Sequence, residues 1–260
     1  MTAPPSRHAT DAALPTLVDL LDEAAARHGD EPRWNVAGMA LSFESMRARS
    51  HADAAALHEA GVAPGARVAL WLPNGEHFVR SCLGCLRGRI IVNPLNPAYG
   101  AAELGNALRV VEPALVLTRA EDAAALRERV DALGLARPPA VAWWEGDALR
   151  VEGELGPVDV EPSASDACAL FFTSGTTGQP KAAMLSHRNF VASALGVTRA
   201  WGWTSDDTLL VALPLFHMHG LGVALHGSLL TGSRLVVQER FSPAGVLDGL
   251  AVDTVVLTGC

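Results

Sequence analysis

The chain has 260 residues, of which 49% are apolar and 18% are charged, and its formal net charge at pH 7 is −8. These values predict a globular chain with one or two cores and exclude a disordered one. The negative charge argues against nucleic acid and anionic membranes as partners, and no apolar run is long enough to cross a bilayer. The N-terminal stretch lacks an apolar signal-peptide segment, so we expect a cytoplasmic protein.

Helix and strand patterns alternate from residue 16 onwards. Thr16 and Asp19 form a capping-box pattern that opens a helix, Gly29 ends it, and a second helix is expected at about 43–60. Strands and helices then follow in turn. The predicted strands are 67–72, 90–93, 115–118 and 141–144, and the predicted helices are 77–87, 101–111 and 120–133.

Residues 145–166 are rich in Gly, Pro, Glu and Asp, so we predict a loop or linker there. The apolar segment at 169–172 predicts the next strand. The remaining predicted strands are 208–212, 234–238 and 254–257, and the remaining predicted helices are 187–201, 220–230 and 243–250. Alternation of this kind predicts an α/β protein whose mainly parallel sheet is covered on both faces.

Two of the four cysteines, Cys82 and Cys85, form a C-x-x-C pair inside a predicted helix. Such a pair can indicate a redox or zinc site, but no second pair follows to complete a zinc site. Cysteines three residues apart share a helix face, where each packs as a small apolar side chain. We therefore predict that both are buried and structural.

Lysine occurs once in the chain, at position 181, while the other basic residues are all arginine. It ends the run TSGTTGQPK, which directly follows the apolar segment at 169–172. Glycine lets a backbone approach a ligand closely, and hydroxyl, amide and ammonium groups together suit phosphate. We therefore predict a polyphosphate-binding loop. Its expected contacts are Thr173, Ser174, Gly175, Thr176, Thr177, Gly178 and Lys181.

Two other interpretations apply to this run. Ser, Thr, Gly and Pro also mark ordinary surface turns, so a surface loop is one alternative. The other is a Walker A motif, which needs four residues between its glycines. Here two residues separate Gly175 from Gly178, and Pro180 precedes Lys181. The spacing therefore excludes a P-loop NTPase and leaves the surface turn as the alternative.

Several segments together resemble one protein family. The run at 173–181, with its continuation to Asn189, resembles the phosphate-binding signature of adenylate-forming (AMP-binding) enzymes of the acyl-CoA synthetase type. Ala182 departs from the family pattern, which has glycine after the lysine. The other family landmarks are resembled, in the same order, by 20–28 (LLDEAAARH), 65–73 (GARVALWLP), 92–99 (VNPLNPAY) and 213–221 (LPLFHMHGL).

The resemblance implies paired, layered α/β sandwiches with mainly parallel sheets, and an incomplete large N-terminal domain. We expect residues 1–166 to form a first α/β subdomain with the N-terminal helices. Residues 167–260 would hold the phosphate loop and the start of a second subdomain. The family is about twice as long as this chain, so we expect a truncated chain without the C-terminal lid domain, inactive on its own.

The resemblance also implies a reaction, the formation of an acyl-adenylate from a carboxylic acid and ATP, followed by transfer to coenzyme A. Lys181 and the loop donors would stabilise charge on the phosphates. Mg²⁺ would bridge the phosphates, but its carboxylate ligand is expected outside this chain. The implied partners are a small carboxylic acid, ATP and CoA, and a homodimer is left open.

His217 and His219 form a second candidate constellation. A metal site with His226 as third ligand is one interpretation, and a histidine packed at a strand–helix junction is another. The resemblance implies a third, in which His217 is catalytic and lies near the acid's carboxylate, with Gly220 leaving room for the substrate. Because no carboxylate lies near the pair in the sequence, we predict no metal at this position.

The resemblance implies the type of reaction more clearly than the identity of the acid. The histidine-x-histidine-glycine-leucine form of residues 217–221 is similar to malonyl-CoA synthetases and to other synthetases for short or medium acids. Two further functions are alternatives to the ligase. One is a truncated, non-catalytic nucleotide-binding module, and the other is an adenylation domain that loads a carrier protein.

Overall fold

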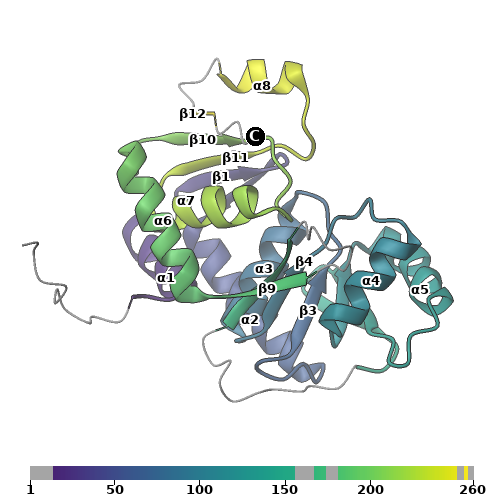
Figure 1. The fold of residues 1–260 in the computed structure, drawn as a ribbon. Coiled ribbons are helices and arrows are strands. Elements are labelled where there is room, and N and C mark those ends of the chain that lie inside the picture. The colour runs from purple at the N-terminus through teal and green to yellow at the C-terminus, as the bar shows by residue number, and fades with distance from the viewer. Residues whose placement is uncertain (1–13, 156–166, 174–180, 251–254, 257–260) are drawn as a thin grey trace, which may run out of the picture.

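The computed structural model describes residues 14–155, 167–173, 181–250 and 255–256, and its strands form two sheets (Figure 1). The larger sheet has the order β7-β6-β5-β3-β4-β8-β9 and the smaller one the order β12-β10-β11-β1-β2. Most neighbours are parallel, and the antiparallel pairs in the described residues are β1–β2, β6–β7 and β8–β9. The predicted mainly parallel α/β fold is confirmed.

The strands are short, as is typical of a buried parallel sheet. The larger sheet consists of β3 (Arg67–Leu70), β4 (Ile91–Pro94), β5 (Leu115–Thr118), β6 (Ala140–Glu145), β7 (Ala148–Glu152), β8 (Ala167–Thr173) and β9 (Lys181–Ser186). The smaller sheet consists of β1 (Pro32–Val36), β2 (Met39–Ser42), β10 (Thr208–Val211), β11 (Arg234–Val237) and β12 (Val255–Val256).

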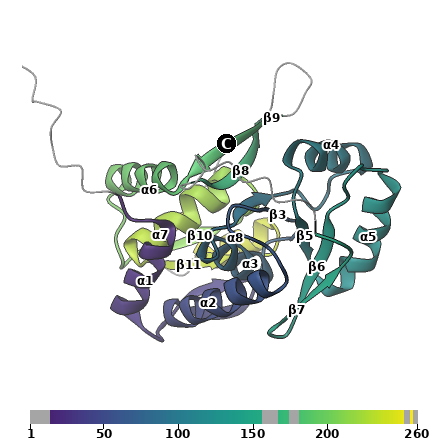
Figure 2. The same ribbon diagram turned by 90° about the horizontal axis from the view of Figure 1, so that it is seen from below.

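Helices cover both sheets. Those that bury side chains in a core common to the two sheets are α1 (Leu17–His28), α2 (Phe43–Glu59), α3 (Glu76–Arg87), α6 (His187–Trp201) and α7 (His226–Thr231). On the opposite face of the larger sheet lie α4 (Ala101–Val111) and α5 (Ala123–Ala132), the latter preceded by a 3₁₀ turn, Ala120–Asp122. Figure 2 shows α4 and α5 on the side of β5 and β6 that faces away from α1 and α2. The last helix, α8 (Pro243–Leu250), lies beyond β10 (Figure 1).

Alternation along β3 explains how one strand serves two cores. Val68 and Leu70 are fully buried in the core shared by the two sheets, whereas Ala69 and Trp71 are buried against α4 and α5. Successive side chains of a strand point to opposite faces, so a strand covered on both sides is apolar throughout. The five apolar residues that follow Arg67 predict a buried strand, and the structure confirms one there.

Several predicted elements agree closely with the structure. α4, β5 and α8 have the predicted bounds, and Thr16 and Asp19 form both hydrogen bonds of a capping box. Cys82 and Cys85 are buried, as predicted, and burial raises the pKa of the Cys82 thiol to about 12. In the described part of the chain, no helix is long and apolar enough to cross a membrane.

The loop prediction for residues 145–166 is wrong at its start. Residue 145 ends β6, and β7 pairs antiparallel with β6 across a tight turn that contains Gly146, whose φ is 58°. A Gly-Asp pair between two strands is a hairpin signal, and Leu149 and Val151 supply the alternating apolar face. The β1–β2 hairpin, which we did not predict, turns at Ala37 and Gly38, both with positive φ.

The two sheets do not divide at residue 166. β8 and β9 complete the sheet of β3–β7, while β1 pairs with β11 from the later part of the chain and β2 pairs with β1. Strand β1 is parallel to β11, with Trp34 opposite Leu235. Both sheets thus contain strands from before and after residue 166, and the division into two α/β subdomains at that residue stays a prediction.

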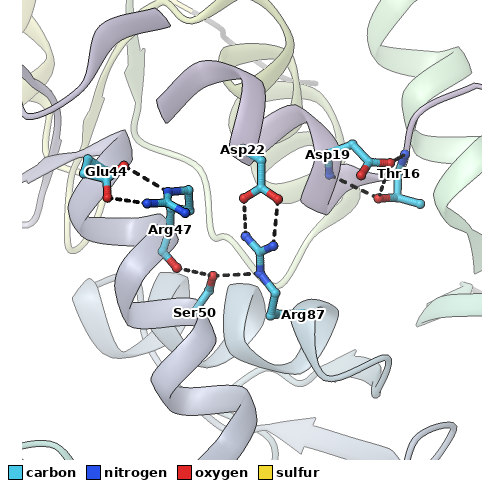
Figure 3. A network of polar contacts seen from close by, with 7 residues as sticks. All are labelled: Thr16, Asp19, Asp22, Glu44, Arg47, Ser50 and Arg87. Carbon is cyan, nitrogen blue, oxygen red and sulfur yellow. Dashed lines mark hydrogen bonds and ion pairs between the residues drawn. The ribbon is translucent and has the colours of Figure 1, made fainter. Parts of the chain in front are cut away.

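A polar network ties three helices of the shared core together (Figure 3). The Arg87 guanidinium on α3 donates two hydrogen bonds to the Asp22 carboxylate on α1, and its Nε donates to Ser50 Oγ on α2 at 3.1 Å. Ser50 Oγ in turn donates to the Arg47 carbonyl at 2.7 Å. The hydrogen bonds from Arg87 lower the pKa of Asp22. A planar fork on a carboxylate fixes both partners, so this network sets how α1 packs on α3.

A second ion pair is buried. Arg80 on α3 donates to both carboxylate oxygens of Asp53 on α2 at 2.8 Å, and the two side chains are 4% and 1% exposed. The guanidinium also stacks 3.9 Å from the Trp144 ring centroid and donates to the Gly146 carbonyl. It therefore joins α2 and α3 to the β6–β7 turn.

We predict that Arg80→Met lowers the free energy of unfolding by about 3–5 kcal/mol, because Asp53 would stay buried without its partner. Urea denaturation monitored by circular dichroism measures this change. The matched control is Arg150→Met, whose ion pair with Glu145 is exposed and is expected to contribute less than about 1 kcal/mol. Equal losses in the two variants would contradict this account of the buried pair.

Candidate functional site

The predicted phosphate loop joins the two strands of the β8–β9 hairpin. Strand β8 ends at Thr173 and β9 begins at Lys181, and these two residues are opposite each other in the register. The β9 strand itself was not predicted. The loop residues Ser174, Gly175, Thr176, Thr177 and Gly178 lie outside the described residues, so their predicted contacts stay predictions.

Lys181 is exposed at the first position of β9. Residues two apart in a strand share a face, so Lys181 lies on the same face as Ala183 and Leu185. Those two side chains line a cavity of about 560 Å³. The predicted cationic residue therefore lies on the cavity-facing side of its strand.

The cavity lies where parallel strands of both sheets end. Its walls come from residues that follow β4 and β10 and from the end of β8, together with the antiparallel β9. Ligand sites of open α/β sheets form at this carboxyl edge. The lining residues are Pro94, Asn96, Tyr99, Phe171, Phe172, Ala183, Leu185, Leu213, Pro214, Phe216, His217, Met218 and His219. A mostly apolar wall with a few polar groups is typical of a small-molecule site.

His217 lies in a tight turn that leads from β10 into a π-helix, His219–Leu225. Its backbone N–H donates to the Pro214 carbonyl at 3.1 Å, and its carbonyl accepts from Leu221 N–H at 3.0 Å. The imidazole contacts the Phe216 ring, with 4.5 Å between centroids. Partial removal from water, and secondly the charge of His219, lower the pKa of His217. A neutral imidazole at this position can accept or donate a hydrogen bond at neutral pH.

Gly220 has a packing role in the structure. A Cβ built on it would lie 2.4 Å from the Pro214 carbonyl oxygen, so no side chain fits there. The residue is buried and is not among the cavity-lining residues. Its absent side chain thus lets the π-helix approach the turn that carries His217, and its predicted contact with substrate stays a prediction. The predicted helix at 220–230 is present as the π-helix followed by α7.

His226 is buried in the core shared by the two sheets and does not line the cavity that His217 and His219 line. It is 1% exposed, and its ring packs edge-to-face on Phe190 at 4.7 Å. Neither ring nitrogen has a hydrogen-bond partner among the described residues. Burial, and secondly the charge of His187, lower the pKa of His226 to about 3. In the described part of the chain, no three His, Cys, Asp or Glu side chains are grouped to hold a metal.

Sequence reasoning missed most of the cavity wall. Asn96 and Tyr99 follow β4, and Phe171 and Phe172 end β8, yet none of the four was named as a site residue. The available signal was their place at, or shortly after, the carboxyl ends of predicted strands, where ligands of α/β sheets bind. That signal does not say which of several strand ends meet, because the strand order is set by long-range pairing.

Comparisons with known proteins show which sequences are similar to this chain. The model of the AMP-binding enzyme family matches residues 21–257. A feruloyl-CoA synthase of an Amycolatopsis species is 34% identical over 233 residues, which cover 90% of this chain and 44% of the relative. A sulfoacetate–CoA ligase of Cupriavidus necator is 33% identical, with coverage of 87% and 46%. The chain spans about half the length of the curated relatives it matches.

A solved structure has a fold similar to that of this chain. Apo MatB from Rhodopseudomonas palustris superposes with a TM-score of 0.74 at 27% sequence identity. The match covers 92% of this chain and 48% of that one. The two-sheet arrangement described above is therefore similar to that of about half of the MatB chain.

We predict that protonation of His226 destabilises the fold as the pH falls. Its pKa is about 3 in the folded chain and 6.5 ordinarily, so between these values the unfolded chain binds a proton that the folded chain does not. The stability contributed by neutral His226 is thus complete above pH 6.5 and is lost as the pH falls, by about 1.4 kcal/mol per pH unit.

Urea denaturation of the wild type and of His226→Leu at pH 7 and pH 5 measures this loss. The wild type should lose about 2 kcal/mol more than the variant between the two pH values. His51→Leu, which removes an exposed imidazole, is the control. Parallel pH dependence of the wild type and His226→Leu would contradict the assignment.

Proposed function

This chain belongs to the AMP-binding enzyme family, and on that premise we propose that it provides the nucleotide- and acid-binding part of an ATP-dependent carboxylic acid–CoA ligase. The observation that carries the proposal is the shared cavity of the β8–β9 hairpin and the His217 turn. The β8–β9 hairpin contributes the predicted phosphate loop and Lys181, and the turn contributes His217, whose pKa is lowered.

In the proposed reaction, a carboxylate oxygen of the acid attacks the α-phosphorus of ATP, and pyrophosphate leaves. The thiol of CoA then attacks the acyl carbon, and AMP leaves. Negative charge builds up on the leaving pyrophosphate, so fixed donors and a cation near it lower the barrier. We assign this role to Lys181 with Thr173, Ser174, Gly175, Thr176, Thr177 and Gly178.

His217 is proposed to orient the acid. A neutral imidazole at the cavity wall can donate a hydrogen bond to the carboxylate or to the acyl-adenylate carbonyl. The Phe171, Phe172 and Phe216 side chains around it exclude water from the mixed anhydride. Gly220 is proposed to serve the same site through the close packing that it allows.

Magnesium is the ion that such a reaction employs on the phosphates of ATP. The described cavity lining contains amide, phenol and imidazole groups but no carboxylate, which is the ligand that Mg²⁺ prefers in proteins. The described cavity lining therefore offers no carboxylate to Mg²⁺, and the roles assigned above are those of the chain's own donors.

The acid is proposed to be short or medium in length, including a dicarboxylic acid. The motif at 217–221 supports this class, and a cavity of about 560 Å³ is in the range of small-molecule sites. We also propose that the protein acts in the cytoplasm, where ATP and CoA are available. A homodimer is the assembly that size-exclusion chromatography would test.

We predict that the 260-residue chain binds ATP and that Lys181→Ala weakens this binding by roughly 10- to 100-fold, the range for a hydrogen bond to a charged group. Isothermal titration calorimetry with MgATP measures the dissociation constant. Arg188→Ala is the matched control, because Arg188 is an exposed cation on the next helix. Equal affinities of wild type and Lys181→Ala would remove the phosphate role of Lys181.

A second assay separates a ligase from its alternatives. Exchange of labelled pyrophosphate into ATP that depends on an added acid indicates adenylate formation, and thioester formation with CoA then distinguishes a CoA ligase from a carrier-protein loader. ATP binding without exchange, in the longest protein that contains this chain, would favour the non-catalytic module.

A further inference from the structure

We propose that Asn74 is a positioning residue that fixes the backbone of residues 213–215, and through it His217, at the wall of the cavity. The functional part of this inference rests on the function proposed above. Asn74 is 7% exposed and is not among the cavity-lining residues, so it would act through the turn and not through a ligand.

The Asn74 carboxamide makes three hydrogen bonds to backbone groups of distant segments. Its Nδ2 donates to the Leu213 carbonyl at 2.9 Å and to the Gln238 carbonyl at 3.0 Å. Its Oδ1 accepts from the Leu215 N–H at 2.7 Å. The first and third bonds bracket the start of the turn, and the second holds the chain directly after β11.

These contacts join the two sheets at the edge where the cavity lies. Asn74 lies between β3 of the larger sheet and helix α3, whereas Leu213 and Gln238 directly follow strands of the smaller sheet. Backbone groups that leave a ladder in a buried position need other partners. Asn74 is the hydrogen-bond partner of three such backbone groups at once. It therefore fixes the ends of the two sheets relative to each other where they meet.

The chemistry of the contact requires a carboxamide. Two donors and one acceptor on a short stem are what asparagine offers, whereas aspartate has no donor when ionised and leucine has neither. An ionised aspartate would place a negative charge against two carbonyl oxygens. The three-way contact thus explains why a buried polar side chain is present where segments of the two sheets meet.

The fixed turn transmits this order to His217. Two residues after Leu215, the His217 N–H closes the turn on the Pro214 carbonyl, and Gly220 packs close to that same carbonyl. Pro214 is thus held between the Asn74 contacts and the π-helix. Any loosening at Leu213 or Leu215 would move His217 relative to the β8–β9 hairpin.

The experiment compares Asn74→Leu with Ser81→Ala in the 260-residue chain. Ser81 is a buried residue of α3 that accepts a hydrogen bond from Trp144 Nε1 at 2.9 Å, so its loss weakens the fold away from the turn. Amide exchange followed by NMR reports protection at Leu215, and an NMR pH titration of the imidazole follows His217. Asn74→Ala, which removes the same three hydrogen bonds with a smaller side chain, is the second variant in case the leucine variant does not fold.

In Asn74→Leu and Asn74→Ala, which both lose the acceptor of the Leu215 N–H, protection of the Leu215 amide should fall by about tenfold or more. The His217 pKa should rise towards its ordinary value, because the imidazole becomes better hydrated. Ser81→Ala should change neither readout. Loss of global stability with an unchanged His217 titration and unchanged Leu215 protection would overturn the inference.

Titration of the same samples with MgATP keeps the two proposals apart. A wild-type chain that does not bind ATP would contradict the proposed function but would not affect the conclusion from amide exchange at Leu215. Conversely, normal ATP binding with no effect of either Asn74 variant on His217 would contradict the positioning role alone.

Discussion

The structure depends on one packing constraint: two sheets share a single apolar core. Helices α1, α2, α3, α6 and α7 bury their side chains between strands of both sheets, and Trp34 of the smaller sheet lies in the same cluster as Val68 of the larger. Burying one continuous apolar surface leaves little freedom in how the sheets meet. Their strand ends are therefore brought to a common edge, where polar loops can form a site without disturbing the core.

That edge explains how segments remote in sequence become one cavity. The β8–β9 hairpin belongs to the larger sheet and the His217 turn follows β10 of the smaller one. Each of them has its own local basis. The hairpin has the cross-strand pairing of β8 with β9, and the turn has the hydrogen bond from the His217 N–H to the Pro214 carbonyl and the close packing that Gly220 allows. Neither segment alone encloses a ligand, so the site is a product of sheet-to-sheet packing.

Local patterns predicted most of the helices and central strands, because capping residues and apolar periodicity act within a few residues. Thr16 with Asp19 and the run at 67–72 are examples. Hairpins with half-polar strands, such as β1–β2 and β6–β7, escaped because their short alternating patterns are weak signals. The cavity wall around Asn96 and Phe171 also escaped, since it depends on which strands pair: β4 lies beside β8, whereas β1 lies beside β11. No local rule specifies such contacts.

The position at which a nucleotide binds is the most direct test of the proposed site. A crystal structure of this chain with a non-hydrolysable ATP analogue would decide it. The account predicts that the phosphates lie at the turn of the β8–β9 hairpin within reach of Lys181, with the α-phosphate directed towards His217. An analogue bound at any other surface, with the cavity between Phe171 and His217 empty, would contradict it.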